Sequence, residues 1–245
     1  MEIFAGLSVV VLILTALAVA VRTFALWSRT RGAPELLLSM YLLLGTVLGY
    51  PLMIASTLIP TSQAWAVHIG GQVVVSLGVV CLLFFTLKVF RPRALWARCW
   101  IGLSLALFAT GSVAYFIELT GENPRPAAEL LGINLLSSTP VAGAYLWTTI
   151  ESLRYHRQLR LRQRLGLAAP AVVNRVLLWG LMSLAAGIAV LANVGGMLVG
   201  SFLSAPMVLG SSCLGIFDAA CLFLAFHPPR WYGVWLERRA PVTAY

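Results

Sequence analysis

Long apolar stretches separated by short polar segments make up most of the chain. About 20 consecutive apolar residues are needed for a helix to cross the hydrocarbon core of a bilayer. Seven stretches reach that length, and they cover approximately residues 3–27, 36–59, 66–90, 100–119, 130–150, 173–198 and 203–226. This pattern predicts an all-α integral membrane protein in which residues 1–226 form a single seven-transmembrane-helix bundle.

The composition agrees with a membrane location. Of the 245 residues, 60% are hydrophobic and only 10% are charged, whereas a soluble domain carries about 25% charged residues. Because a soluble domain of this length cannot hide so much apolar surface, we expect a multi-pass protein of the cell (inner) membrane.

The basic residues are distributed unevenly between the two sides of such a bundle. Of the 17 Lys and Arg residues, only Arg125 falls in a loop on one side. The others follow the first, third, fifth and seventh stretches, and they are Arg22, Arg29, Arg31, Lys88, Arg91, Arg93, Arg98, Arg154, Arg157, Arg160, Arg162, Arg164, Arg175, Arg230, Arg238 and Arg239. Cytoplasmic loops carry the excess of Lys and Arg, so we expect the N-terminus outside and the C-terminus in the cytoplasm.

The basic side also bears on the partners. The net charge of +9 lies in loops that would meet the anionic headgroups of the bilayer, and no basic stretch is interleaved with aromatic residues as in a nucleic-acid-binding protein. Residues 151–164 are expected to continue the fifth helix out of the membrane as a solvated basic face. Residues 227–245 are expected to form a short basic, aromatic cytoplasmic tail, with Trp231 and Trp235 at the interface. We expect contact with a cytoplasmic protein and none with nucleic acid.

Weak internal similarity suggests a repeat. The segments 81–84 and 221–223 are alike, and they lie near the ends of the third and seventh stretches. Helices one to three and five to seven could therefore be parallel repeats around helix four, a 3+1+3 design known in transporters; chance similarity is the alternative. The Gly-xxx-Gly pairs 45/49 and 196/200 allow close helix packing, within the chain or in a homo-oligomer.

One carboxylic acid lies deep inside an apolar stretch. Asp218 precedes His227 by nine residues, which places it about 13 Å inside the cytoplasmic end of the seventh helix. An ionised side chain there costs roughly 2.5–3.5 kcal/mol on insertion scales, so we expect a neutral carboxyl that faces the bundle. It is a candidate proton-coupling group or latch, and a carboxyl that merely joins helices is the alternative. The hydroxyl groups at matching depth, its candidate partners, belong to Thr46, Thr110 and Ser183.

Several polar residues lie at similar depth in the outer half of the predicted bundle. Many are three or four positions apart, so they share a helix face. If these faces converge, they line an outward-facing polar pocket for a small ligand; ordinary polarity at helix ends is the alternative. The candidate ligand-binding residues are His68, Gln72, Tyr115, Glu118, Asn134 and Asn193.

The sequence argues against two membrane cofactors. The seven-helix layout resembles that of microbial rhodopsins, whose retinal needs a Schiff-base lysine in helix seven. The only lysine here is Lys88, at the end of the third stretch, so a retinal Schiff base is excluded. Transmembrane haem needs pairs of histidines inside the membrane, and only His68 lies within an apolar stretch. No cofactor is predicted.

Motifs for catalysis and metal binding are absent from the sequence. It contains no His-Glu-x-x-His, no Gly-x-Ser-x-Gly and no phosphate-binding loop, so we do not expect an enzyme. The four cysteines lie in or at the ends of apolar stretches and form no Cys-x-x-Cys pair. They are expected to pack as small hydrophobic residues, with no metal site.

Functions from three classes fit these features. The first is a receptor-like membrane sensor or small-ligand-binding module, with its ligand at the outer polar residues and Asp218 as an internal latch. The second is a transporter of a small molecule coupled to protonation of Asp218. The third is a structural or assembly subunit of a membrane complex.

Overall fold

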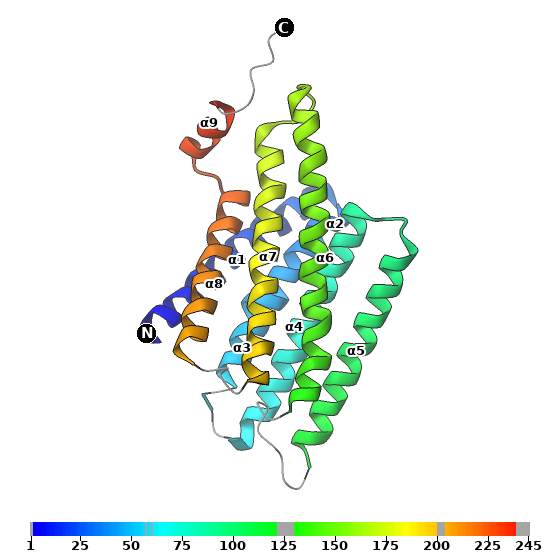
Figure 1. Cartoon of the computed structure of the whole chain (residues 1–245), viewed down its shortest axis with the longest axis vertical. Helices are drawn as coiled ribbons and strands as arrows, with labels where there is room; N and C mark the ends of the chain where they lie inside the picture. Colours follow the sequence, from blue (N-terminus) through cyan, green and yellow to red (C-terminus); the bar gives the residue numbers. More distant parts are fainter. Residues whose placement is uncertain (1, 57, 60, 122–129, 200–203, 239–245) are drawn as a thin grey trace.

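The computed structural model describes residues 2–56, 58–59, 61–121, 130–199 and 204–238, and the regular elements in these ranges are all helices. Figure 1 shows them as a bundle elongated along one axis. The elements are α1 (Glu2–Thr30), α2 (Ala33–Met40), η1 (Tyr41–Gly49), α3 (Tyr50–Ala55), α4 (Thr61–Phe90), α5 (Leu95–Leu119), α6 (Leu131–Arg164), α7 (Pro170–Leu198), α8 (Ala205–Phe226) and α9 (Arg230–Arg238).

Six helical segments of the described ranges are long and apolar enough to cross a membrane. They correspond to the predicted stretches one to four, six and seven, and the second is formed by α2, η1 and α3 together. The chain is therefore an all-α, multi-pass membrane protein. α6 corresponds to the fifth predicted stretch, but polar residues along its length and the arginines of its C-terminal half lower its mean hydropathy.

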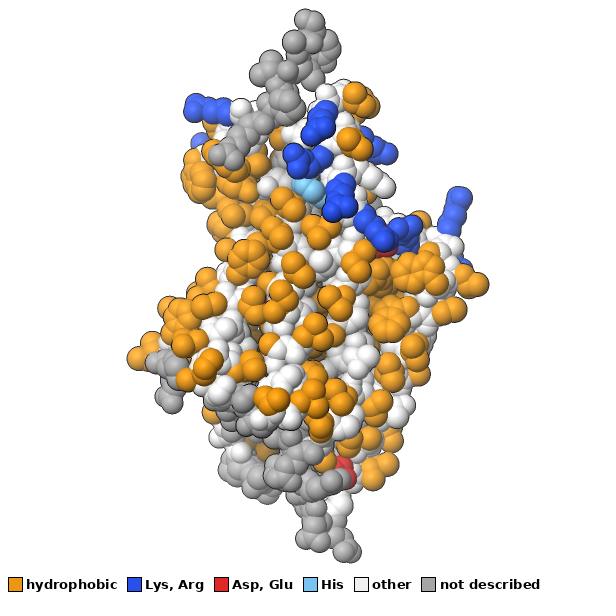
Figure 2. Space-filling model, viewed as in Figure 1, with side chains coloured by type: hydrophobic (Ala, Val, Ile, Leu, Met, Phe, Trp, Pro, Cys, Tyr) orange, Lys and Arg blue, Asp and Glu red, His pale blue; other side chains and the backbone are white. Residues whose placement is uncertain are grey.

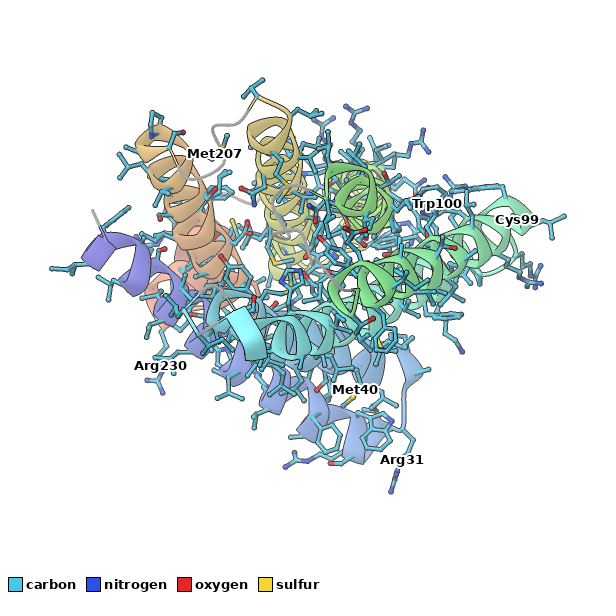
Figure 3. All side chains as sticks on the ribbon, turned by 90° about the horizontal axis from the view of Figure 1, so that it is seen from below. Arg31, Met40, Cys99, Trp100, Met207 and Arg230 are labelled. Atoms are coloured by element: carbon cyan, nitrogen blue, oxygen red, sulfur yellow. The ribbon has the colours of Figure 1, made fainter. Side chains whose placement is uncertain are left out.

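The helices form a closed ring. Around it, α1 packs against α2 and η1, η1 against α4, α4 against α6, α6 against α7, α7 against α8, and α8 again against α1. Between α4 and α6, the hydroxyl groups of Thr86 and Thr148 are fully buried and lie 2.8 Å apart, within hydrogen-bond distance. α5 lies outside the ring against α4 and α6, and in the view from below (Figure 3) its Cys99 is at the periphery.

A π-helical segment, η1, interrupts the second predicted stretch. The N–H of Tyr50 donates to the carbonyl of Gly45, five residues earlier. Pro51 accounts for this local widening, because proline has no N–H to donate and its ring clashes with the carbonyl four residues before it. Such segments are frequent at functional sites, and the buried side chain of Tyr41 lies at the start of η1.

Contact with α4 occupies one of the predicted Gly-xxx-Gly faces. A Cβ atom added to Gly78 would lie 2.5 Å from the backbone nitrogen of Gly45, and one added to Gly49 would lie 2.8 Å from the backbone nitrogen of Val75. Backbones approach this closely only where a residue has no side chain. The 45/49 face therefore joins η1 to α4 within one chain and is not free to hold a second copy.

Candidate functional site

Positive charge gathers at one end of the bundle (Figure 2). The Lys and Arg side chains of the visible face lie at the end where α6 leads into α7, and hydrophobic side chains cover the sides. Many of these are large residues that the bundle leaves exposed, such as Leu103, Val113 and Phe116 of α5. We call the charged region the basic end.

An ion pair with a buried carboxylate and exposed arginines lies at the basic end. Glu151 of α6 is only 4% exposed, and Nε of Arg91 lies 3.0 Å from both of its carboxylate oxygens. Nη1 of Arg154 lies 3.7 Å from one of them. The prediction of a solvated face over residues 151–164 is therefore wrong at its start, because pairing with two arginines allows Glu151 to be buried, and Ser152 is buried beside Gly180 of α7.

Two arginines hold the C-terminal end of α8. The guanidinium group of Arg22 donates to the carbonyl of Phe226, and Nε of Arg175 donates to the carbonyl of Ala225 at 3.0 Å. The last carbonyls of a helix lack partners within it and carry partial negative charge, so cations suit this position. Burial and the charge of Arg22 together lower the pKa of His227, which directly follows the helix.

The acid predicted inside the membrane, Asp218, lies on α8 within electrostatic range of two tyrosines, Tyr41 of η1 and Tyr145 of α6. The hydroxyl groups of the two tyrosines lie 3.2 Å apart and share a hydrogen bond. Oδ1 of Asp218 is buried and has no hydrogen-bond partner in the described part of the chain. We call these three residues the interior site; they come from η1, α6 and α8.

Aromatic rings and further unsatisfied polar atoms flank the interior site. Trp179 of α7 packs edge-on against Tyr41, with ring centroids 6.3 Å apart, and it also contacts Phe85 and Phe226. Among the described residues, neither Nε1 of Trp179 nor Oγ of Ser183, one turn along α7, has a hydrogen-bond partner, and both atoms are buried. Buried polar atoms without partners are rare. This part of the core therefore contains more polar atoms than the described hydrogen bonds satisfy.

The hydroxyl groups predicted as partners of Asp218 are placed differently from one another. Ser183 is fully buried on α7, which packs against α8, but its Oγ makes no hydrogen bond to the acid. Thr46 is half-buried in η1. Thr110 is exposed on α5, which packs against α4 and α6. The structure therefore does not bring Thr110 to Asp218, and none of the three predicted hydroxyl groups has a described hydrogen bond to Oδ1 of the acid.

Four polar residues meet at the end opposite the basic one, and we call them the histidine cluster: Ser56, His68, Tyr115 and Asn134. Nδ1 of His68 lies 3.1 Å from Oγ of Ser56, and its ring centroid is 5.2 Å from that of Tyr115. The hydroxyl of Tyr115 donates to Oδ1 of Asn134. Three of the predicted ligand-binding residues, carried by α4, α5 and α6, thus converge with Ser56 at the end of α3.

The hydrogen bonds of Ser56 define the tautomer of His68. A serine hydroxyl has one proton, and that of Ser56 is donated to the carbonyl of Met53 at 2.7 Å. With that proton engaged, the Ser56 oxygen is free to accept from His68, and this arrangement assigns the imidazole proton to Nδ1 and leaves Nε2 as an acceptor. Within the described residues, Nε2 is buried and has no partner.

The remaining predicted ligand-binding residues lie on the same helices or farther away. Gln72 is buried on α4, one turn along from His68. Glu118 is half-buried near the end of α5 and is engaged with another group. Asn193 is half-buried on α7, and the described contacts that join the histidine cluster do not include it.

Sequence reasoning missed Tyr41, Tyr145 and Ser56. The tyrosines carried a usable signal, because a phenol inside an apolar stretch needs a hydrogen-bond partner and both stretches place one in the half of the bundle that holds Asp218. Ser56 carried none, since hydroxyl residues near the end of a membrane helix are common. Only the approach of α3 to α4 makes Ser56 a partner of His68.

No protein family, no curated protein and no solved structure matches the chain. Among the residues that the structure describes, no group of three or more His, Cys, Asp and Glu side chains could hold a metal ion. Any function must therefore be argued from the interior site, the histidine cluster and the basic end.

Proposed function

We propose that the protein is a membrane sensor or small-ligand-binding module whose ligand binds at the histidine cluster. The observation that supports this most is the buried Nε2 of His68, which has no hydrogen-bond partner among the described residues and belongs to a ring packed against that of Tyr115. A buried acceptor that lacks a donor costs about 1–3 kcal/mol, and a ligand that donates a hydrogen bond recovers this energy. The ligand class is therefore a small molecule with a hydroxyl, amide or ammonium donor.

The proposed topology has seven crossings, with the N-terminus outside and the basic end in the cytoplasm. The cluster of arginines at one end (Figure 2) supports it through the positive-inside rule. α6 would be the seventh crossing, because it packs against α4, α5 and α7 and so can keep polar residues inside the bundle. A 3+1+3 repeat agrees with the ring, in which the helices on each side of α5 pack in chain order.

Cysteine accessibility tests this orientation. The four native cysteines are first replaced by serine, and single cysteines are then introduced as Thr120→Cys at the end of α5 or Gln158→Cys on α6, both exposed positions. We expect a membrane-impermeant maleimide to label Thr120→Cys in intact cells and Gln158→Cys only after the membrane is opened. The reverse pattern would overturn the orientation.

Ligand-induced stabilisation tests the binding site. The purified protein is unfolded by heat in the presence of small hydroxylated, amide and amine compounds, since a ligand at 100 times its Kd stabilises by about 2.7 kcal/mol. The His68→Phe variant keeps a ring against Tyr115 but lacks Nε2, so it should lose the stabilisation. Thr120→Ala, a control at the same end, should keep it. A binder that stabilises His68→Phe as well as the wild type would overturn the site.

Transport coupled to protonation of Asp218 is the second candidate function, and the interior site favours it. Oδ1 of Asp218 has no partner among the described residues, and the hydrogen-bonded hydroxyls of Tyr41 and Tyr145 lie within its electrostatic range. An acid in such a place can gain and lose a proton as helices rearrange. Asp218→Asn cannot, so it should abolish proton-linked uptake into liposomes and leave ligand-induced stabilisation unchanged. Undiminished uptake would contradict this function.

A further inference from the structure

A groove with three arginines lies at the basic end, where α1, α7 and α8 meet. Its volume is about 380 Å³, and its lining includes Arg22, Leu26, Arg29, Arg175 and Phe226. No acidic side chain is among the described residues that line it. The groove therefore joins concentrated positive charge to apolar surface.

The positive charge of the groove comes from two helices. Arg22 and Arg29 are seven residues apart on α1, which is about two turns, so they lie on the same face. Arg175 reaches the groove from α7. The C-terminal end of α8 contributes only about half a negative charge, which offsets a small part of three guanidinium groups. The groove consequently attracts anions.

Hydrogen bonds hold two of these arginines in position. Arg22 donates to the carbonyl of Phe226, and Arg175 donates to the carbonyl of Ala225 while its guanidinium carbon lies 5.9 Å from the centre of the Phe226 ring. A guanidinium group has five N–H donors, so one carbonyl leaves most of them for a further acceptor. Positioned arginine forks match the oxygens of a phosphate and lose little entropy on binding it.

Apolar side chains lie next to the arginines in the groove. Leu26 is 47% exposed one turn after Arg22 on α1, and Phe226 reaches the lining from α8. The site therefore offers cations for a headgroup next to apolar surface for acyl chains.

We propose that this groove binds an anionic phospholipid of the surrounding bilayer, with its phosphate on Arg22, Arg29 and Arg175 and its acyl chains along Leu26 and Phe226. Phosphatidylglycerol fits because it carries a net negative charge. Phosphatidylcholine fits poorly because its quaternary ammonium group would meet three guanidinium groups. The site lies at the opposite end from the histidine cluster and does not depend on the ligand proposed there.

Native mass spectrometry of the full chain, titrated with phosphatidylglycerol or phosphatidylcholine in mild detergent, tests the proposal. The wild type should retain one phosphatidylglycerol at concentrations where phosphatidylcholine is not retained. Each arginine should contribute about fivefold to the affinity, so the triple variant R22Q/R29Q/R175Q should bind about a hundredfold more weakly. The single variant Arg29→Gln keeps the hydrogen bonds of Arg22 and Arg175 to the end of α8, and it should bind phosphatidylglycerol about fivefold more weakly.

A matched control distinguishes lipid binding in the groove from a general attraction of anionic lipid to the positively charged protein. The variant R160Q/R162Q/R164Q removes the same charge from exposed positions of α6, and it should keep the affinity of the wild type for phosphatidylglycerol. An equal loss of affinity in this control would overturn the site, as would equal retention of phosphatidylcholine. Displacement of the lipid by millimolar inorganic phosphate would show a site for soluble anions and overturn the lipid assignment.

Discussion

Glu151 and Asp218 are both acids of the helical bundle, but their surroundings are opposite. Both oxygens of Glu151 lie 3.0 Å from Nε of Arg91, and Arg154 adds a second cation. Asp218 has one oxygen enclosed without a hydrogen-bond partner in the described chain, and it interacts with the phenols of Tyr41 and Tyr145 only electrostatically.

Position along the helix accounts for the difference. Glu151 lies where the arginines of the basic end can reach it, so its burial is compensated by charge pairing. Asp218 lies about 13 Å inside its helix end at 1.5 Å per residue, beyond the arginines that cap α8. A paired acid stabilises the fold, whereas an acid without a cation is retained at a cost and is the better candidate for function.

The largest expected effect is that of Glu151→Ala. This substitution leaves Arg91 without its partner, but the arginine side chain is 42% exposed and regains water. We therefore expect a loss of about 2 kcal/mol in the free energy of unfolding, at the low end for a charged hydrogen-bonded pair. Chemical unfolding in detergent measures it, and Glu237→Ala on exposed α9 should change stability by less than about 0.5 kcal/mol. A loss no larger than this control would show that the pair contributes nothing.

A double-mutant cycle sharpens the same point. If Arg91 and Glu151 stabilise the protein through each other, the double variant R91A/E151A should lose less stability than the two single variants added together. We expect a coupling free energy of about 1.5 kcal/mol, within the range for residues in contact. Strict additivity would mean that each residue acts through other neighbours.

Matched isosteric substitutions compare the two acids directly. Asp218→Asn should change the free energy of unfolding by less than about 1 kcal/mol, because no cation is lost and the amide has nearly the same shape. Glu151→Gln should cost more, since it removes the charge that pairs with Arg91. Both are measured in the same unfolding assay. A greater loss for Asp218→Asn would make Asp218 a packing residue and remove the basis for its role in signalling or transport.

The smallest expected effect is a change in the pKa of His227, which depends on the nearby positive charge of Arg22. Burial first and Arg22 second lower its pKa below the ordinary 6.5. The neutral imidazole is thus favoured in the folded state, so its contribution to stability is complete above pH 6.5 and is lost as the pH falls. Arg22→Gln should raise the pKa without restoring 6.5, because burial remains. NMR titration of the three histidines measures this, and an unchanged value would exclude the influence of Arg22.

Apolar length was sufficient to predict most of the fold. Each predicted stretch is occupied by a helix, and six of the segments are apolar enough to span. The unpaired acid was also predictable, because Asp218 stands alone in an apolar stretch. The common depth of His68, Tyr115 and Asn134 was predictable, whereas the sequence left open whether their helix faces converge.

Contacts between helices were not predictable in the same way, since they depend on how each helix is rotated about its axis. Glu151 was expected on a solvated face because its segment is rich in arginine, yet its helix turns it toward Arg91. Thr110 has the depth of Asp218 but is exposed on the outer helix α5. The sequence allowed Gly45 to pack either within the chain or in a dimer, and in the structure its backbone packs against Gly78 of α4.

The most direct test of the proposed function is native mass spectrometry of the protein purified gently from its own membrane, for the wild type and His68→Phe. We expect one co-purifying small molecule per wild-type chain, distinct in mass from phospholipid and absent from His68→Phe. A wild type that carries no such molecule, or a His68→Phe variant that retains it, would contradict ligand binding at the histidine cluster.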